Sequence, residues 1–352
     1  MPLVVRPVLR RELTVDEPAL AQTYQPGVAW EWQWDAARVN QVPDWVLRAA
    51  AGVKIAVIDS GADLGAPDVA DKHPSTWSVL SRSAGVRDTL GHGTFVSSLA
   101  AGSVENGVGI SGFGGDAQLL VVQAIDSDGY VTDVDEAAAI VYAVKHGAKI
   151  VNLSIGGSET SALERRTIRW AARQGVLVVA AAGNEHDAGN QPEYPAALVQ
   201  PLGSNGRGGI GLAVGATSMN GTRAYFSNTG SYLSLAAPGY NVFAAESAEA
   251  AWPRAQLPWA SPGVYGWASG TSFSSPEVAG AAALVWAANP RLTAQQVASV
   301  LKQSADGDKW NRELGWGRLD AAAAVQLATQ TTSAALRHAR YDPRPIHSSP
   351  PS

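Results

Sequence analysis

Short apolar segments that alternate with helical patterns are the feature that most constrains the fold of this chain. Strands are predicted over 53–58, 119–125, 149–155, 176–181, 210–214 and 232–236, and helices over 92–101, 133–146, 161–174, 271–288 and from 293 onward. Strands that are apolar throughout are buried on both faces, as in parallel sheets covered by helices. We therefore predict an α/β fold with three layers, in which a mostly parallel central sheet has helices on both faces.

The ends of the chain differ in composition from its middle. Residues 1–24 carry several prolines, and we predict an N-terminal arm there. Residues 329–352 end in a Pro- and Ser-rich stretch, which predicts a disordered C-terminal tail. Residues 25–328 are expected to form one domain.

Composition excludes several function classes. The net charge is −5 and the chain has no long Lys/Arg cluster, so nucleic-acid binding has no electrostatic support. The absence of cysteine excludes disulfides, thiolate metal sites and a cysteine nucleophile. No apolar run approaches the roughly 20 residues that span a membrane. Because Met1–Arg6 lacks the apolar core of a signal peptide, the protein either stays inside the cell or has lost a leader.

Chemically useful residues occur where strands end and helices begin, which is where parallel sheets bind ligands. Asp59 follows the first strand in Ile-Asp-Ser-Gly, and His92 stands in Gly-His-Gly-Thr at the start of a helix. Asn184 follows the fourth strand in Ala-Ala-Gly-Asn, and Ser272 follows Gly-Thr at the start of another helix. Each residue could instead have a purely structural role. Asp59 could shape a turn, and His92 could pack at the start of a helix. Asn184 could hold a turn in the left-handed conformation, and Ser272 could be an N-cap.

The nucleophile cannot be assigned from composition alone, because Ser269, Ser274 and Ser275 lie beside Ser272. A serine at a helix N-terminus does suit nucleophilic chemistry, since the free N–H groups there stabilise developing negative charge. The order Asp, His, Ser, with each residue in a Gly-rich turn, favours catalysis over four independent structural roles.

Together the four motifs resemble the signature blocks of the subtilases, and the similarity extends over about residues 25–328. The resemblance implies a serine endopeptidase that forms an acyl-enzyme on Ser272, with His92 as general base and acid and Asp59 orienting His92. It also implies an oxyanion hole made by the Asn184 side chain and the Ser272 backbone N–H.

The resemblance further implies polypeptide substrates, bound as an extended strand by a protein that acts as a monomer. The segment 152–157 is similar to the family's lining of the primary specificity pocket, and 127–129 is similar to the opposite edge. The implied substrate-binding residues are Ser127, Asp128, Gly129, Ser154, Ile155, Gly156, Ala182 and Gly183. Alternatively, Gly156–Gly157 is only a turn.

No cofactor is expected for the chemistry, but a structural calcium ion is implied by a loop, 104–110, that resembles the family's calcium loop. The implied ligands are Asp68, the Asn106 side chain and the carbonyls of Val104, Val108 and Ile110. The family's ligand from the N-terminal arm cannot be placed, and retention of the loop without the ion is the alternative. Secretion is expected from the resemblance.

The chain departs from the family pattern at Phe273 and Glu277, where many members carry Met and His. The loop 198–209 is expected to be mobile and near the specificity pocket. The segment 246–264 is also unusual, and its Trp252 and Trp259 are expected to pack locally.

Two other function classes remain to be weighed. A non-catalytic peptide-binding protein of the same fold would not need a free nucleophile beside a histidine. An α/β-hydrolase esterase would need a G-x-S-x-G turn and the order Ser, Asp, His, which this sequence lacks.

Overall fold

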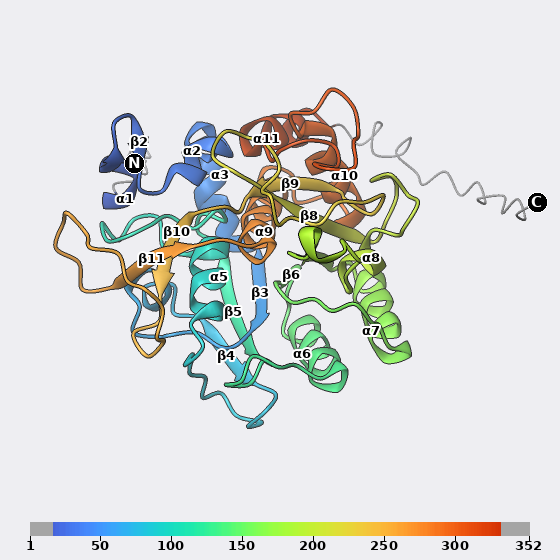
Figure 1. Cartoon of the computed structure of the whole chain (residues 1–352), viewed down its shortest axis with the longest axis horizontal. Helices are drawn as coiled ribbons and strands as arrows, with labels where there is room; N and C mark the ends of the chain where they lie inside the picture. The colour runs from blue at the N-terminus through green and yellow to red at the C-terminus, as the bar shows by residue number, and fades with distance from the viewer. Residues whose placement is uncertain (1–16, 332–352) are drawn as a thin grey trace, which may run out of the picture.

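Side chains along the central strands point alternately into two separate hydrophobic cores. In the strand β3 (Lys54–Asp59), Ile55 and Val57 belong to one core and Ala56 and Ile58 to the other. This alternation requires helices on both faces of the sheet. The computed structural model describes residues 17–331 and contains this sheet, seven parallel strands in the order β4-β5-β3-β6-β7-β8-β9 (Figure 1). The other six strands are β4 (Ser75–Ser78), β5 (Gln118–Gln123), β6 (Ile150–Leu153), β7 (Leu177–Ala181), β8 (Gly211–Thr217) and β9 (Leu235–Pro238).

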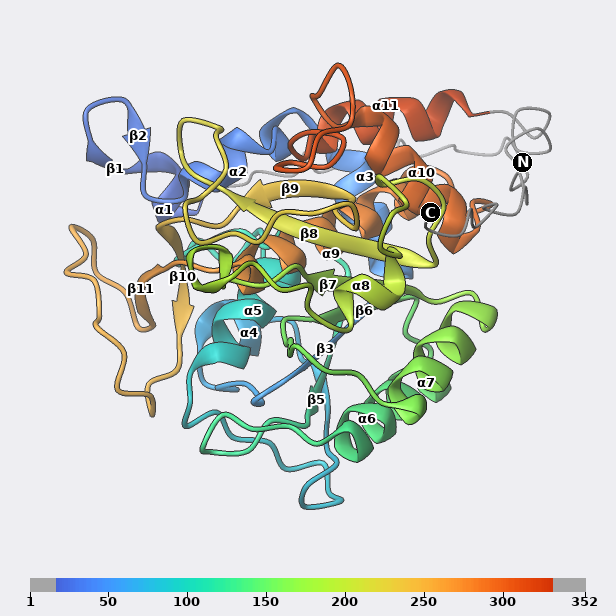
Figure 2. The same ribbon diagram turned by 45° about the vertical axis from the view of Figure 1, so that its right-hand side comes forward.

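The helices form the two outer layers. One core is covered by α5 (His92–Ala101), α9 (Thr271–Ala288), α10 (Ala294–Ser304) and α11 (Ala321–Gln330). The other is covered by α6 (Asp133–Lys145), α7 (Ala162–Arg173) and α8 (Ala196–Val199). Figure 2 shows α6 and α7 on the opposite side of the sheet from α10 and α11. The predicted three-layer α/β fold is confirmed.

α9 lies almost entirely inside the protein, and its composition explains how this is possible. From Phe273 to Ala287 every one of its side chains is buried, and most of them are small. A helix that is apolar on all sides is a buried helix. Its small residues permit close approach: a Cβ at Gly280 would lie 2.6 Å from the backbone of Phe113. This burial fixes the N-terminal end of α9, where Ser272 lies.

Shorter elements complete the described chain. They are α1 (Pro18–Ala21), β1 (Thr23–Gln25), β2 (Val28–Ala29), α2 (Trp32–Ala36), η1 (Val39–Gln41), α3 (Asp44–Ala49), η2 (Ala50–Gly52), α4 (Pro67–Ala70), η3 (His186–Ala188), β10 (Val242–Glu246) and β11 (Val264–Ala268). The strands β10 and β11 form an antiparallel pair outside the main sheet. None of the helices within residues 17–331 combines the length and the apolar character that crossing a membrane requires.

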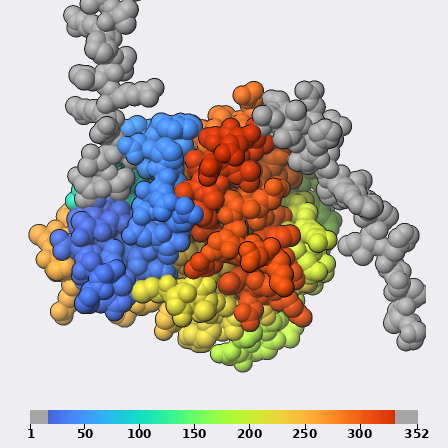
Figure 3. Space-filling view, turned by 90° about the horizontal axis from the view of Figure 1, so that it is seen from above, coloured from blue at the N-terminus to red at the C-terminus, as the bar shows by residue number. Residues whose placement is uncertain are grey.

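The N-terminal segment packs beside the C-terminal helices, as the adjoining blue and red surfaces of Figure 3 show. The Ala321 N–H donates to the Ala37 carbonyl at 2.9 Å, and Arg38 pairs with Asp320. Glu17 and Ala19 are fully buried, so this part of the expected arm belongs to the packed domain. Residues 1–16 of the arm, and 332–352 of the expected tail, lie outside the described residues.

The order of the strands in the sheet indicates where a ligand would bind. After β3 the chain forms β4 and β5 on one side of that strand, and then returns to form β6 on its other side. Open parallel sheets bind ligands beyond the carboxyl ends of the strands at such a reversal. Asp59 is the last residue of β3 and so lies at this point.

Candidate active site

Asp59 and His92 form a hydrogen-bonded pair at the end of β3. His92 Nδ1 lies 2.7 Å from Asp59 Oδ1, which also accepts the Ser60 N–H at 2.8 Å. The Asp59 side chain is fully buried, while the His92 side chain keeps 19% of its surface exposed. Because Nδ1 faces the carboxylate, His92 Nε2 is the ring nitrogen left to act as a base.

Asp88, which the sequence analysis did not single out, holds the start of α5 in place. Its Oδ1 accepts from Ser60 Oγ and the Gly91 N–H, each at 2.8 Å, and its Oδ2 accepts the Thr94 N–H at 2.7 Å. The N-cap residue Gly91 has no side chain with which to cap the helix, so Asp88 supplies the acceptor. Asp88 therefore ties the helix that carries His92 to the loop that follows Asp59.

Ser272 is held by Ser154 at the carboxyl end of β6. Pro276 has no N–H to donate to the Ser272 carbonyl one helical turn earlier, and Ser154 Oγ donates to that carbonyl instead, at 2.6 Å. Ser272 Oγ in turn donates to the Ser154 carbonyl at 3.3 Å. Rotation about the Cα–Cβ bond of Ser272 would turn this hydroxyl away from the Ser154 carbonyl toward another partner.

Asn184 is oriented by the first residue of α9. Its Oδ1 accepts the Thr271 N–H at 2.8 Å and Thr271 Oγ1 at 3.0 Å. Because both bonds engage the carbonyl end of the amide, the Nδ2 end is free to donate elsewhere. The N-cap residue of α9, Gly270, has no side chain that could accept from the Ser272 N–H. The site thus contains two kinds of N–H donor close to Ser272.

His92, Asn184 and Ser272 border one cavity of about 470 Å³. Phe273, which replaces the methionine of many family members, lies with its ring centroid 5.6 Å from the His92 ring and 4.6 Å from that of Phe95. Trp252 also lines the cavity and contacts Phe95. Trp259 packs against Trp30 and Phe243, which agrees with the packing role expected for it. For Trp252, the structure adds a position at the cavity wall that nothing in its local sequence indicates.

The electrostatic environment of the Asp59–His92 pair favours the protonated form of His92. Burial of the ring opposes its charge, but the adjacent Asp59 carboxylate and the more distant Asp88 outweigh burial and raise the pKa of His92 above its ordinary value of 6.5. An imidazole with a raised pKa accepts a proton more readily, and the buried carboxylate stabilises the cation that results.

The predicted substrate-binding residues lie on two sides of this region. Ser127, Asp128 and Gly129 form an exposed turn after β5, and the Asp128 N–H donates to Asp126 Oδ1 at 3.0 Å. Ser154 is buried, while Ile155 and Gly156 extend from the end of β6 toward the surface.

On the far side of β6, Ala182 is fully buried, and its carbonyl accepts Tyr232 Oη at 2.8 Å. The Gly183 N–H donates to Thr271 Oγ1 at 3.1 Å. The segments 154–156 and 182–183 therefore both adjoin the start of α9.

The predicted calcium-binding residues also come together. Asp68 is fully buried; its Oδ1 accepts the Ile110 N–H at 3.3 Å and its Oδ2 accepts Tyr265 Oη at 2.7 Å. Glu17, in the N-terminal segment, adjoins this loop, and its Oε1 accepts the Asn106 N–H at 3.1 Å. Asn106 Oδ1 accepts the Val108 N–H at 2.9 Å. Two carboxylates, an amide and a backbone loop are a donor set that suits calcium.

The loop 198–209 lies away from the cavity that His92 and Ser272 border. Trp316 Nε1 donates to the Gly206 carbonyl at 3.1 Å, and Lys302 Nζ of α10 donates to the Gly208 carbonyl at 2.7 Å. The loop lines a separate cavity against α10. These contacts hold the loop against α10 and Trp316, and none of its residues lines the cavity that His92 and Ser272 border.

Comparisons with known proteins agree with this geometry. Residues 50–317 match the subtilase family. The chain is 32% identical to thermitase of Thermoactinomyces vulgaris over 84% of its length and 96% of the relative's, and 33% identical to subtilisin BL of Lederbergia lenta over 83% and 98%. The solved structure of a protease from Pseudoalteromonas arctica superposes with a TM-score of 0.66 at 28% identity, covering 84% of this chain and 97% of that one. The chain belongs to the subtilase family and is a serine endopeptidase.

Proposed function

We propose that Asp59, His92 and Ser272 are the catalytic triad of this endopeptidase. The observation that carries the proposal is the 2.7 Å contact between His92 Nδ1 and Asp59, together with the cavity that His92 and Ser272 share. Ser272 Oγ attacks the carbonyl carbon of the peptide bond as His92 Nε2 takes its proton. His92 then returns the proton to the leaving amine, and water releases the acyl group from Ser272 by the same steps.

The negative oxygen of the tetrahedral intermediate is stabilised by Asn184 Nδ2 and the Ser272 N–H. The two hydrogen bonds from Thr271 to Asn184 Oδ1 support this role, because they fix the amide before substrate arrives. Members of the family hydrolyse polypeptides and need no cofactor for the reaction.

The pH dependence of hydrolysis tests the assigned base. Because His92 must be neutral to accept the proton and its pKa is raised, kcat/KM should fall on acidification with a midpoint above 6.5. The measurement is kcat/KM for one peptide across pH, with circular dichroism at each pH to separate titration from unfolding. Maximal activity in a folded protein below about pH 5 would rule out His92 as the base.

The substrate is proposed to lie as an extended strand between 127–129 and 154–156, and the protein to act on it as a monomer, with neither nucleic acid nor membrane as a partner. Support comes from the turn at Ser127–Gly129, which is exposed, and from Ile155 and Gly156, which extend from β6. Exposed backbone at two facing edges can pair with an added strand.

A structural calcium ion is also proposed, held by Asp68, Asn106, Glu17 and the carbonyls of Val104, Val108 and Ile110. Bound calcium would stabilise the folded state only, so chelation should lower the melting temperature by about 5 °C or more. Asp68→Asn should abolish this response, whereas the exposed Asp308→Asn, as matched control, should retain it. Equal melting temperatures with calcium and with chelator would exclude the site.

A further inference from the structure

The carboxylate of Glu193 lies between Gly156 and Gly183, two of the residues expected to bind substrate. A Cβ at Gly156 would lie 2.2 Å from Glu193 Oε2, and a Cβ at Gly183 would lie 2.7 Å from Glu193 Cδ and 3.0 Å from Glu185 Oε2. Gly183 has a φ of 106°, which favours glycine, whereas a larger residue at Gly156 would displace the Glu193 carboxylate. Glu185 Oε2 accepts the Asn184 N–H at 2.6 Å, which brings the acidic pair next to the proposed oxyanion hole.

This pair has no cation of its own. Neither Glu185 nor Glu193 takes part in an ion pair within the described chain. Burial, followed by a hydrogen bond to Glu185 and the charge of Glu185, raises the pKa of Glu193 to about 8. Without a cation beside it, Glu193 therefore keeps its proton at neutral pH. A positively charged side chain would stabilise the pair better, because it can neutralise both groups.

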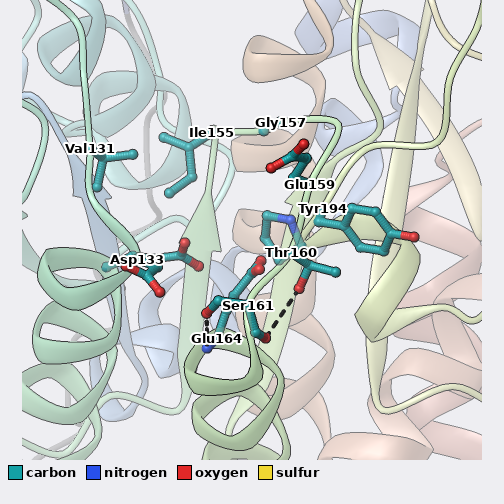
Figure 4. A pocket seen from close by; sticks show the side chains of 12 residues that line it. Val131, Asp133, Ile155, Gly157, Glu159, Thr160, Ser161, Glu164 and Tyr194 are labelled. Atoms are coloured by element: carbon teal, nitrogen blue, oxygen red, sulfur yellow. Dashed lines mark hydrogen bonds between the residues drawn. The ribbon is translucent and has the colours of Figure 1, made fainter.

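A second acidic cluster lies beyond Ile155, in a pocket where α6 and α7 begin. Its volume is about 450 Å³, and it is lined by Ile155 and Gly156 together with Asp133, Glu136 and Glu164. Figure 4 shows Asp133 and Glu164 at the starts of the two helices. The pocket therefore shares one wall with the proposed substrate strand.

The buried carboxyl group of Glu136 is the feature that indicates a binding site in this pocket. It is only 7% exposed, it lines the pocket, and its Oε1 has no hydrogen-bond partner within residues 17–331. Burial, then Glu164 and Asp133, raise the pKa of Glu136 to about 8. A buried carboxyl oxygen without a partner is costly unless a ligand satisfies it. The neighbouring carboxyl groups favour a ligand with a positive charge.

We propose that the cleft selects polypeptides with two basic side chains, one bound by Glu193 and Glu185 and the other by Glu136 and Glu164. The inference rests on the proposed function, in which the substrate runs along 154–156, and we place the residue before the scissile bond at Gly156, beside Glu193. We place the second basic residue further toward the substrate's N-terminus, on the side of Ile155 and the pocket that Glu136 lines. Arginine suits both acidic clusters, since its planar guanidinium can donate to two carboxyl groups at once.

The test is a set of matched peptides that carry Arg, Lys, Gln or Leu at one position at a time. For the full chain, Arg or Lys should raise kcat/KM about 10- to 100-fold over Gln and Leu at the residue before the scissile bond, and again at one more N-terminal position. Glu193→Gln should lower only the first ratio, and Glu136→Gln only the second. Glu313→Gln, an exposed glutamate far from both acidic clusters, should keep both ratios.

Each outcome decides one statement. Cleavage that prefers Leu or Gln at both positions, or a preference that survives in Glu193→Gln and Glu136→Gln, overturns the inference and leaves the endopeptidase intact. Failure to cleave any peptide, together with failure of Ser272 to react with a fluorophosphonate, overturns the proposed function instead. If Glu193→Gln melts at a lower temperature than the parent, Glu193→Asp replaces it, and the first ratio should then be kept in part.

Discussion

Replacing Ser272 with alanine is expected to lower kcat by about 10⁶, the size of the effect of losing the nucleophile in subtilisin itself. The change removes one oxygen atom, which donates only a 3.3 Å hydrogen bond in this structure. The fold should therefore be kept, because the Ser272 carbonyl still accepts from Ser154. The measurement is kcat for a peptide substrate, with the melting temperature as the check on folding.

The matched control is Ser274→Ala, which removes the next hydroxyl of the same helix. Ser274 Oγ donates away from the cavity, to the carbonyls of Ala237 and Pro238 at 3.1 and 3.0 Å. Its loss should reduce stability slightly and leave kcat within a few-fold. If the pure Ser272→Ala protein hydrolysed peptides at a rate near that of the parent, Ser272 would not be the nucleophile.

Replacing Asn184 with alanine is expected to lower kcat by about 10²–10³ with little change in KM, a magnitude known for the oxyanion-hole asparagine of subtilisin. Asn184 Nδ2 would donate only to charge that develops during the reaction, so its loss acts on the transition state and not on substrate binding. The measurement is the separate determination of kcat and KM.

Asn184→Asp distinguishes donation from positioning. Aspartate keeps an oxygen that can accept from Thr271 N–H and Oγ1, but it replaces the donating amide by a second oxygen. If Asn184 acts as the donor, Asp should be no better than Ala. Recovery of most activity in Asn184→Asp would show that Asn184 only positions Thr271.

The sequence could predict the main elements because they are local. A strand such as β7 is apolar throughout, and α5 begins at the predicted His92. Strand β4 was not predicted, since Ser-Thr-Trp-Ser at the sheet edge has no apolar run. The pair β10–β11 was not predicted either, because the segment 247–263 separates its strands.

Some residues of the candidate site could be identified from the sequence and others could not. Asp59, His92, Asn184 and Ser272 could be selected because each lies in a Gly-rich motif at a strand end or helix start. Asp88 could not, since its role depends on contacts with Ser60 and Thr94 that only the folded loops create.

The acidic pocket beside Ile155 could not be predicted either, because its carboxyl groups come from residues far apart in the sequence. At the start of α7 the Ser161 side chain accepts the Glu164 N–H at 3.0 Å, as an N-cap residue does. The Glu164 side chain nevertheless lines the pocket with Glu136, a residue of the preceding helix. Nothing in the pattern of either helix indicates that these two carboxyl groups face one cavity.

Glu277 shows that a departure from the family pattern can have a structural cost. It is fully buried in α9, and neither of its carboxyl oxygens has a hydrogen-bond partner within residues 17–331. Burial, followed by the charge of Glu31, raises the pKa of Glu277 well above its ordinary value. The sequence indicated the substitution but could not indicate this environment.

Whether Asp59, His92 and Ser272 act together in catalysis is tested most directly by the site and rate of fluorophosphonate labelling, with mass spectrometry of the labelled peptide. We expect a single adduct, on Ser272, whose formation slows by several orders of magnitude in His92→Ala. An adduct on another residue, or equal labelling of Ser272 in folded His92→Ala, would contradict it.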